Sequence, residues 1–172
     1  MGGNTKTFFI SDTHFNHKNI MQYCNREFTS VEEMNKTIIK NWNSVVKNTD
    51  IVYFLGDLCL GGAEQIEFFT KQLNGRKRMV RGNHDRSVAL YLAAGFEEVS
   101  RNTIIVEEFY IASHKPVFLN PSIPYVNIHG HIHNTTQTLL NSDGKNLYYN
   151  VSVEMINYTP INFDEIKRYY NG

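Results

Sequence analysis

Short apolar runs rich in β-branched and aromatic residues recur along the chain, and in its first half they alternate with longer amphipathic stretches. Runs of the first kind are typical of buried strands, whereas apolar residues spaced three and four positions apart indicate a helix. On this basis we predict five principal strands, at 6–11, 51–56, 79–82, 109–113 and 126–130.

The stretch 30–46 has the clearest helical pattern. Ser30 can cap its start, and Glu33, three residues later, completes a capping box. Met34, Ile38, Trp42 and Val45 fall on one face at helical spacing, which indicates a stripe that faces the core. Further helices are predicted at 63–73, ended by Asn74-Gly75, at 87–94, ended by Gly95, and at 164–170.

The second half of the chain is mostly strand. Residues 96–100, 103–106 and 109–113 are predicted to form an antiparallel meander with bends at 101–102 and 107–108, and 147–153 another strand after a turn at 141–144. Alternating strands and helices followed by strands predict an α/β domain with a mixed sheet. A length of 172 residues fits a single domain over residues 1–172 with a core of its own.

Charge and composition narrow the classes of partner. Seventeen basic and seventeen acidic residues cancel, so the net charge indicates neither a nucleic-acid partner nor a membrane surface. Nucleic acid nevertheless stays a possible substrate. Arg76-Lys77-Arg78 and Arg81 form a local basic cluster, either a solvated loop entering a strand or a rim that faces phosphate. Two cysteines make no disulfide framework, no signal-peptide layout opens the chain, and no apolar stretch reaches membrane-spanning length, so we expect a cytoplasmic protein.

Each of the five apolar runs is followed by side chains that bind metals. These residues are Asp12, His14, Asp57, Asn83, His114, His131 and His133. The binding crevice of an open α/β sheet lies beyond the carboxyl ends of its strands, so we expect the seven to converge on one cleft. Taken singly, each has another interpretation: a core histidine for His114, a turn for Asn83, a helix cap for Asp12. Together they are too many for one tetrahedral zinc and suit two metals that share a carboxylate.

The ordered motifs resemble a known family. D-x-H at 12–14, G-D at 56–57, G-N-H-D at 82–85, His114, and G-H-x-H at 130–133 match the calcineurin-like metallophosphoesterase superfamily, in its order and with no motif missing. The stretch 12–17 is similar to a small single-domain bacterial and phage branch. The resemblance implies a sandwich of two mixed β-sheets flanked by helices.

The same resemblance implies how the ligands divide. Metal one takes Asp12, His14, Asp57 and His133; metal two takes Asp57, Asn83, His114 and His131. A bridging Asp57 carboxylate offsets the repulsion between two dications roughly 3.5–4 Å apart. The two ions can then deprotonate a water that they share, and the resulting hydroxide attacks phosphorus. The two divalent ions can be Mn, Fe, Zn, Ni or Co, with Mn favoured. Asp12 and His14 lie two apart, so an extended backbone would point both the same way.

The catalytic residues expected beside the metals are His84 and Asp85. By resemblance His84 contacts phosphate and protonates the leaving oxygen, and Asp85 orients its imidazole. His17, with Asn83 and His84, is a candidate for substrate binding, or else a surface loop histidine. His129 is interpreted as structural rather than as a ligand, and Gly61-Gly62 either presents amides to phosphate or forms a turn.

The function predicted first is hydrolysis of small phosphoesters, with phosphodiesters favoured because one compact domain has little chain for a cap that would enclose a monoester. The alternatives are a phosphomonoesterase or a nuclease built on the same site. A non-catalytic binding scaffold is the alternative from another class. The presence of His84 and of every ligand argues against the scaffold.

Overall fold

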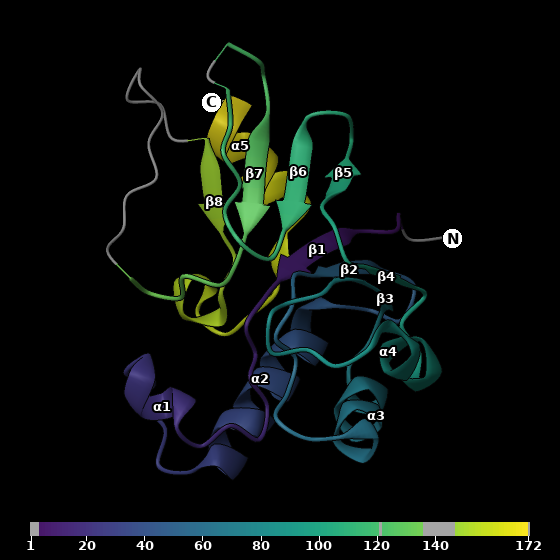
Figure 1. Cartoon of the computed structure of the whole chain (residues 1–172), viewed down its shortest axis with the longest axis vertical. Coiled ribbons are helices and arrows are strands. Elements are labelled where there is room, and N and C mark those ends of the chain that lie inside the picture. The colour runs from purple at the N-terminus through teal and green to yellow at the C-terminus, as the bar shows by residue number, and fades with distance from the viewer. Residues whose placement is uncertain (1–3, 121, 136–146, 172) are drawn as a thin grey trace.

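The computed structural model describes residues 4–120, 122–135 and 147–171, so the turn predicted at 141–144 lies outside the described residues. Two β-sheets and a layer of helices make up this part of the chain, with the five-stranded sheet seen nearly edge-on between the four-stranded sheet and the helices (Figure 1). The predicted architecture of two mixed sheets flanked by helices is thereby confirmed.

The five-stranded sheet is buried on both faces. Its order is β4 (Glu98–Ser100), β3 (Arg76–Val80), β2 (Ile51–Phe54), β1 (Thr7–Ile10) and β9 (Ile161–Asn162), with β1 to β4 parallel and β9 antiparallel. Phe8 and Ile10 pack in the core on the helical side, whereas Phe9 packs in the core toward the other sheet. This burial on both faces explains why the sequences of β1 and β2 are continuous apolar runs rather than alternating apolar and polar residues.

Helices α2 (Val31–Val45), α3 (Ala63–Gln72) and α4 (Val88–Ala94) cover the outer face of that sheet, and the short α1 (Ile20–Tyr23) precedes α2 (Figure 1). The Ser30 side chain accepts the Glu33 N–H at 3.1 Å, as the capping pattern predicts. Of the predicted stripe, Met34, Ile38 and Trp42 are buried, but Val45 is exposed. Val46, just past the helix end, is buried instead because the chain leaves the helix there.

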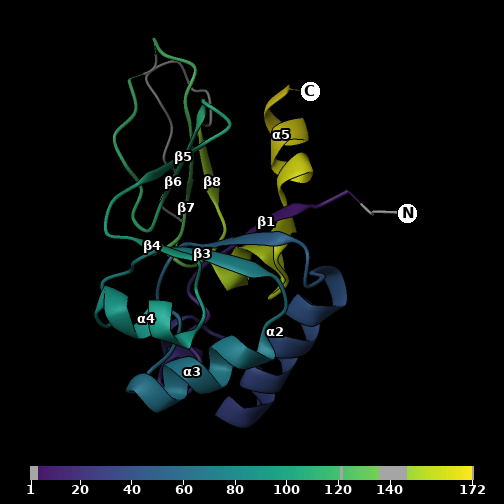
Figure 2. The ribbon, with the colours of Figure 1, turned by 90° about the vertical axis from the view of Figure 1, so that its right-hand side faces the viewer.

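The four-stranded sheet has the order β5 (Ile104–Val106), β6 (Tyr110–Ser113), β7 (Val126–His129) and β8 (Tyr148–Asn150). β5 and β6 are antiparallel, and the other pairs are parallel. Helix α5 (Phe163–Asn171) lies beside the four-stranded sheet in Figure 2. Its Phe163 and Ile166 are buried in a core cluster that includes residues of both sheets. The strand predicted at 147–153 is shorter than expected, because a 3-10 turn, η1 (Val153–Ile156), follows it.

The predicted meander over 96–113 is wrong. β4 pairs in parallel with β3 in the five-stranded sheet, so of the three strands predicted for the meander only β5 and β6 pair in antiparallel fashion. Helix α4 lies between β3 and β4, so these form a strand–helix–strand crossover, and such a connection returns the chain parallel. Apolar alternation reports which face of a strand is buried, not which strand lies beside it.

The two sheets are joined at the ends of β1 and β8. Ser11 donates its N–H to the Val151 carbonyl at 2.9 Å, and Val153 donates to the Ser11 carbonyl at 3.1 Å. This bridge between Ser11 and Ser152 brings the carboxyl ends of strands from both sheets to one edge of the molecule. Within the described ranges, no helix has the length and apolarity needed to cross a bilayer.

Candidate metal centre

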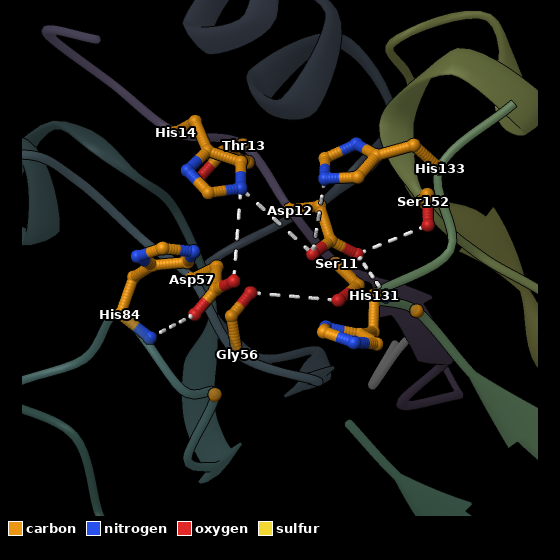
Figure 3. A network of polar contacts seen from close by, with 12 residues as sticks. Ser11, Asp12, Thr13, His14, Gly56, Asp57, His84, His131, His133 and Ser152 are labelled. Carbon is orange, nitrogen blue, oxygen red and sulfur yellow. Dashed lines mark hydrogen bonds and ion pairs between the residues drawn. The ribbon is translucent and has the colours of Figure 1, made fainter. Parts of the chain in front are cut away.

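The seven side chains predicted as ligands gather where the two sheets meet (Figure 3 shows five of them). Asp12, His14 and His133 form one group, and Asp57, His114 and His131 another, with the potential ligand atoms of each group within 4.8 Å of one another. We name them group one and group two. Asn83 joins group two, since its Oδ1 lies 2.9 Å from the His114 Nε2.

Asp57 faces both groups. Its Oδ2 lies 3.7 Å from the His14 Nε2 and 3.4 Å from the His114 Nε2. Its Oδ1 accepts the backbone N–H of His84 at 2.9 Å, which orients the carboxylate (Figure 3). This placement is what a carboxylate shared by two cations requires.

The backbone beneath the ligands is not extended, so the predicted geometry of the D-x-H motif is wrong. Asp12 and His14 adopt positive φ angles of 59° and 48°, and Asp57, His131 and His133 do the same at 61°, 69° and 49°. The chain is held there by bonds between loops, since Asp12 donates its N–H to the Gly56 carbonyl at 2.9 Å. Left-handed backbone at non-glycine residues is uncommon and clusters at functional sites.

The glycines of the motifs allow close approach between the loops. A Cβ on Gly82 would lie 2.1 Å from the Asp57 Oδ1, and a Cβ on Gly130 would lie 2.2 Å from the Asp12 Oδ2. No larger residue fits at either position without moving a carboxylate. Gly82 and Gly130, which precede Asn83 and His131, thus let the loops approach closely enough to bring the candidate ligands together.

The unpaired polar atoms of the centre fit divalent cations. The Asp12 Oδ1 and the His14 Nε2 are buried and have no hydrogen-bond partner, although buried polar atoms normally have one. Burial, helped by the nearby His133 and Arg26, lowers the pKa of His14 to about 2, so its imidazole is neutral and free to coordinate. Burial raises the pKa of Asp57 to about 6, with His114 opposing and the Asp12 carboxylate adding to the shift. A dication between these carboxylates would favour their ionised forms.

Three buried residues that sequence reasoning missed support group one. Arg26 is 3% exposed, and its guanidinium donates to the carbonyls of Asp12, at 2.7 Å, and Thr13, at 2.9 Å. The same guanidinium pairs with Glu154, whose Oε1 lies 2.7 Å from Nη2. Ser152 donates to the Asp12 Oδ2 at 3.0 Å (Figure 3). No local motif marks these residues, since Arg26 and Glu154 are 128 positions apart.

Glu154 links this buried pair to a ligand. Its Oε1 lies 3.0 Å from the His133 Nδ1, which leaves Nε2 on the side of Asp12, 3.9 Å from Oδ1. Burial lowers the pKa of His133, but hydrogen bonds with Cys24 and Glu154 outweigh it and raise the value to about 10. A carboxylate behind a histidine ligand fixes the ring and raises its basicity.

Asp85 has a different position from the one expected. Its Oδ2 accepts the N–H groups of Asp57 and Gly82, each at 2.7 Å, and its Oδ1 accepts from Leu58 and the Tyr91 hydroxyl. The carboxylate is therefore engaged by the backbone of two loops rather than by the His84 imidazole. It clamps the loop after β2 to the loop after β3. His84 itself is exposed, with its ring 5.6 Å from that of His14.

The remaining candidates divide between the site and the scaffold. The half-buried His17 ring lies 5.4 Å from that of His14, so it borders the centre. His129 is buried, and its Nδ1 bonds the Gly130 carbonyl at 3.0 Å, a structural position. The Gly62 N–H donates to Gln65 at the start of α3, as in a turn that caps a helix. Arg76–Arg78 begin β3, at the end opposite the ligands, so they do not rim the centre.

A cleft of ≈ 440 Å³ gives access to the ligands. It is lined by Asp57, His84, His131 and His133, and on the other side by Ile20, Tyr23 and Cys24 from α1 and the residue that follows it. An exposed imidazole and both ligand groups thus face one opening.

Comparison with known proteins finds similarity along most of the chain. The family model for calcineurin-like phosphoesterases matches residues 5–167. The uncharacterized protein MJ1445 of Methanocaldococcus jannaschii is 44% identical over 94% of this chain and 89% of its own length. The Gene 66 protein of Mycobacterium phage L5 is 35% identical over 84% of this chain and 76% of its own. A protein of unknown function from Aquifex aeolicus, AQ665, superposes with a TM-score of 0.77 at 28% identity, over 96% of this chain and all of its own. The chain belongs to the calcineurin-like phosphoesterase family.

Proposed function

We propose that the protein is a binuclear metal-dependent phosphodiesterase. The observation that carries the proposal is the pair of ligand groups that share Asp57, with the buried Asp12 Oδ1 and His14 Nε2 left unpaired. Asp12, His14, Asp57 and His133 would hold one divalent ion, and Asp57, Asn83, His114 and His131 the other. The bound ions would supply an activated water and neutralise charge on the phosphoryl oxygens.

His84 is the proton donor in this proposal. Its imidazole is exposed in the cleft beside Asp57, and its backbone N–H is fixed by the Asp57 carboxylate, so the side chain stands next to the ligands without being one. From there it can protonate the leaving oxygen, while His17 and the Asn83 amide contact the phosphate. Asp85 acts on His84 only indirectly, by holding the loops that carry Asp57 and His84 together.

The open shape of the cleft supports a diester rather than a monoester. A diester has two ester arms and one negative charge, whereas a monoester dianion gains most from a closed cationic pocket. Among the described residues, the lining of this cleft includes no lysine or arginine. The phosphomonoesterase is therefore the second candidate on the same site, and a non-catalytic scaffold is disfavoured because the ligands and His84 are all in place.

The test combines metal analysis with two substrates. Protein stripped with a chelator and reloaded with Mn²⁺ is expected to bind two ions per chain and to hydrolyse bis(p-nitrophenyl) phosphate with a higher kcat/KM than p-nitrophenyl phosphate at neutral pH. A stoichiometry that never exceeds one ion would contradict the binuclear centre. A clear preference for the monoester would contradict the open-cleft argument alone.

A further inference from the structure

A second cleft borders the candidate metal centre on the side of Asn83 and His114. It encloses ≈ 550 Å³ and shares no lining residue with the cleft that contains His84. The ligands of group two are thereby divided, since Asn83 and His114 line this cleft and Asp57 and His131 line the other. The centre lies between two openings, so a substrate bound at the metals can extend into both.

The walls of this second cleft carry positive charge and no carboxylate. Arg81 follows β3, Arg101 lies between β4 and β5, and Lys115 follows β6, and all three line the cleft. No aspartate or glutamate is among the described residues that line it. Three separate segments therefore supply the cations, and only the fold brings them together. We name this opening the basic cleft.

The three cations lack acidic partners within the described part of the chain. Within β3, Arg76 pairs with Glu97 at 2.7 Å and Arg78 with Glu98 at 4.0 Å, but no ion pair joins Arg81, Arg101 or Lys115 to a carboxylate among the described residues. The Arg81 Nε is buried without a hydrogen-bond partner, and its Nη2 reaches only the Asp85 carbonyl, at 3.5 Å. Uncompensated guanidinium groups beside a phosphoester site are suited to bind a further phosphate, which they contact through paired N–H donors.

We propose that the basic cleft binds a second phosphate group of the substrate, next to the phosphate that is cleaved. This inference rests on the proposed phosphodiesterase function and narrows its substrate to phosphodiesters that carry at least one further phosphate, for which nucleotides are the probes. The second phosphate can be a terminal phosphate of a short nucleotide or the next phosphodiester of an oligonucleotide. Both kinds of phosphate present charged oxygens to the cleft, and the substrates compared below distinguish a short nucleotide from an oligonucleotide.

The experiment compares substrates that differ by one phosphate. The Mn²⁺-loaded protein is given the thymidine dinucleotide TpT, its 5′- and 3′-phosphorylated forms, and a thymidine hexanucleotide, with products resolved by anion-exchange chromatography. We expect one phosphorylated form to exceed TpT in kcat/KM by roughly 10- to 100-fold, the range for hydrogen bonds to a charged group. A preference for the hexanucleotide over that form would assign the cleft to a polynucleotide, and the reverse to a short nucleotide.

Arg101→Ala is expected to lower the ratio of kcat/KM for the preferred phosphorylated form to kcat/KM for TpT toward one, mainly by raising KM for the phosphorylated form. Arg168→Ala, which removes the same charge from the exposed surface of α5, is the matched control and should leave the ratio unchanged. Equal kcat/KM for TpT and both phosphorylated forms, or a ratio that Arg101→Ala does not change, would overturn the proposal.

A binding measurement keeps this test independent of turnover. Calorimetry with inorganic pyrophosphate, in the presence of a chelator, should show at least roughly 10-fold weaker binding to Arg101→Ala than to the wild-type protein. Equal affinities would count against the basic cleft as an anion site. Weaker binding by Arg101→Ala in a protein that hydrolyses no phosphodiester would support the cleft and count against the proposed function alone.

Discussion

The two ligand groups of the centre are supported in different ways. Behind group one lies a buried pair of charges, Arg26 and Glu154, which comes from segments far apart in the chain and contacts both the Asp12 loop and His133. Behind group two lie the Leu55 carbonyl, which the His114 Nδ1 bonds at 2.8 Å, and the buried carboxylate of Asp85. The Asp57 and Gly82 N–H groups are likewise held, through Asp85.

This difference has energetic consequences. A buried ion pair must offset the cost of removing two charges from water, and the loss of one partner leaves the other uncompensated. The buried carboxylate of Asp85 behind group two is compensated by backbone N–H groups and the Tyr91 hydroxyl, not by a second charge. Group one should therefore be sensitive to the loss of either charge of the Arg26–Glu154 pair, whereas group two should depend on the loops that carry its own candidate ligands and on the Asp85 carboxylate that joins them.

The largest effects are expected where the two groups meet. His84→Ala should lower kcat by roughly 10²–10⁴, the range for a lost general acid, while both metals stay bound. Asp57→Asn should weaken metal binding at both groups, by more than the roughly 10–100-fold that an outer partner of a ligand contributes. Metal content and kcat measured on the same preparations separate the two roles. If His84→Ala lost its metals or turned over normally, the division of roles would be wrong.

The contributions of a buried ion pair and of an exposed ion pair to the free energy of unfolding can be compared directly. Arg26→Met leaves Glu154 buried without its partner and should lower the free energy of unfolding by about 3–5 kcal/mol. Arg76→Met breaks the exposed pair with Glu97 and should change it little, because exposed pairs contribute little. Urea unfolding of both variants and the wild type measures the difference.

The double variant Arg26→Met, Glu154→Met sharpens the same comparison. Removing both charges should recover part of the stability that Arg26→Met loses, since no uncompensated charge remains. Equal destabilisation by Arg26→Met and Arg76→Met would show that the buried pair is not what supports the Asp12 loop.

The smallest effect should be confined to one group. Glu154→Gln keeps the shape of the side chain but removes the charge behind His133, and should weaken Mn²⁺ binding at group one by roughly 10–100-fold. The affinity of group two should not change. A Mn²⁺ titration followed by electron paramagnetic resonance resolves the two events, with the exposed Glu64→Gln on α3 as the control. Equal weakening of both ions would contradict the separate support of the two groups.

Much of the fold could be predicted from local pattern. The Ser30 cap and the apolar stripe of α2 mark that helix because capping and burial depend on residues a few positions apart. The apolar runs mark β1 and β2 because strands buried on both faces are mostly apolar. The seven candidate ligands could be named because parallel strands place their carboxyl ends together.

The remaining features depend on contacts between distant segments. Apolar alternation in β4 could not show that its partner is β3, and the D-x-H spacing could not show the positive φ angles that loop-to-loop hydrogen bonds impose on Asp12 and His14. Arg81 could be picked out from its local basic cluster, but Arg26, Glu154, Arg101 and Lys115 have no marker in their own neighbourhoods, because the residues they meet are supplied by other elements. Local sequence determined which side chains end the strands, and only the packing of the two sheets decided which buried charges and which cleft lie beside them.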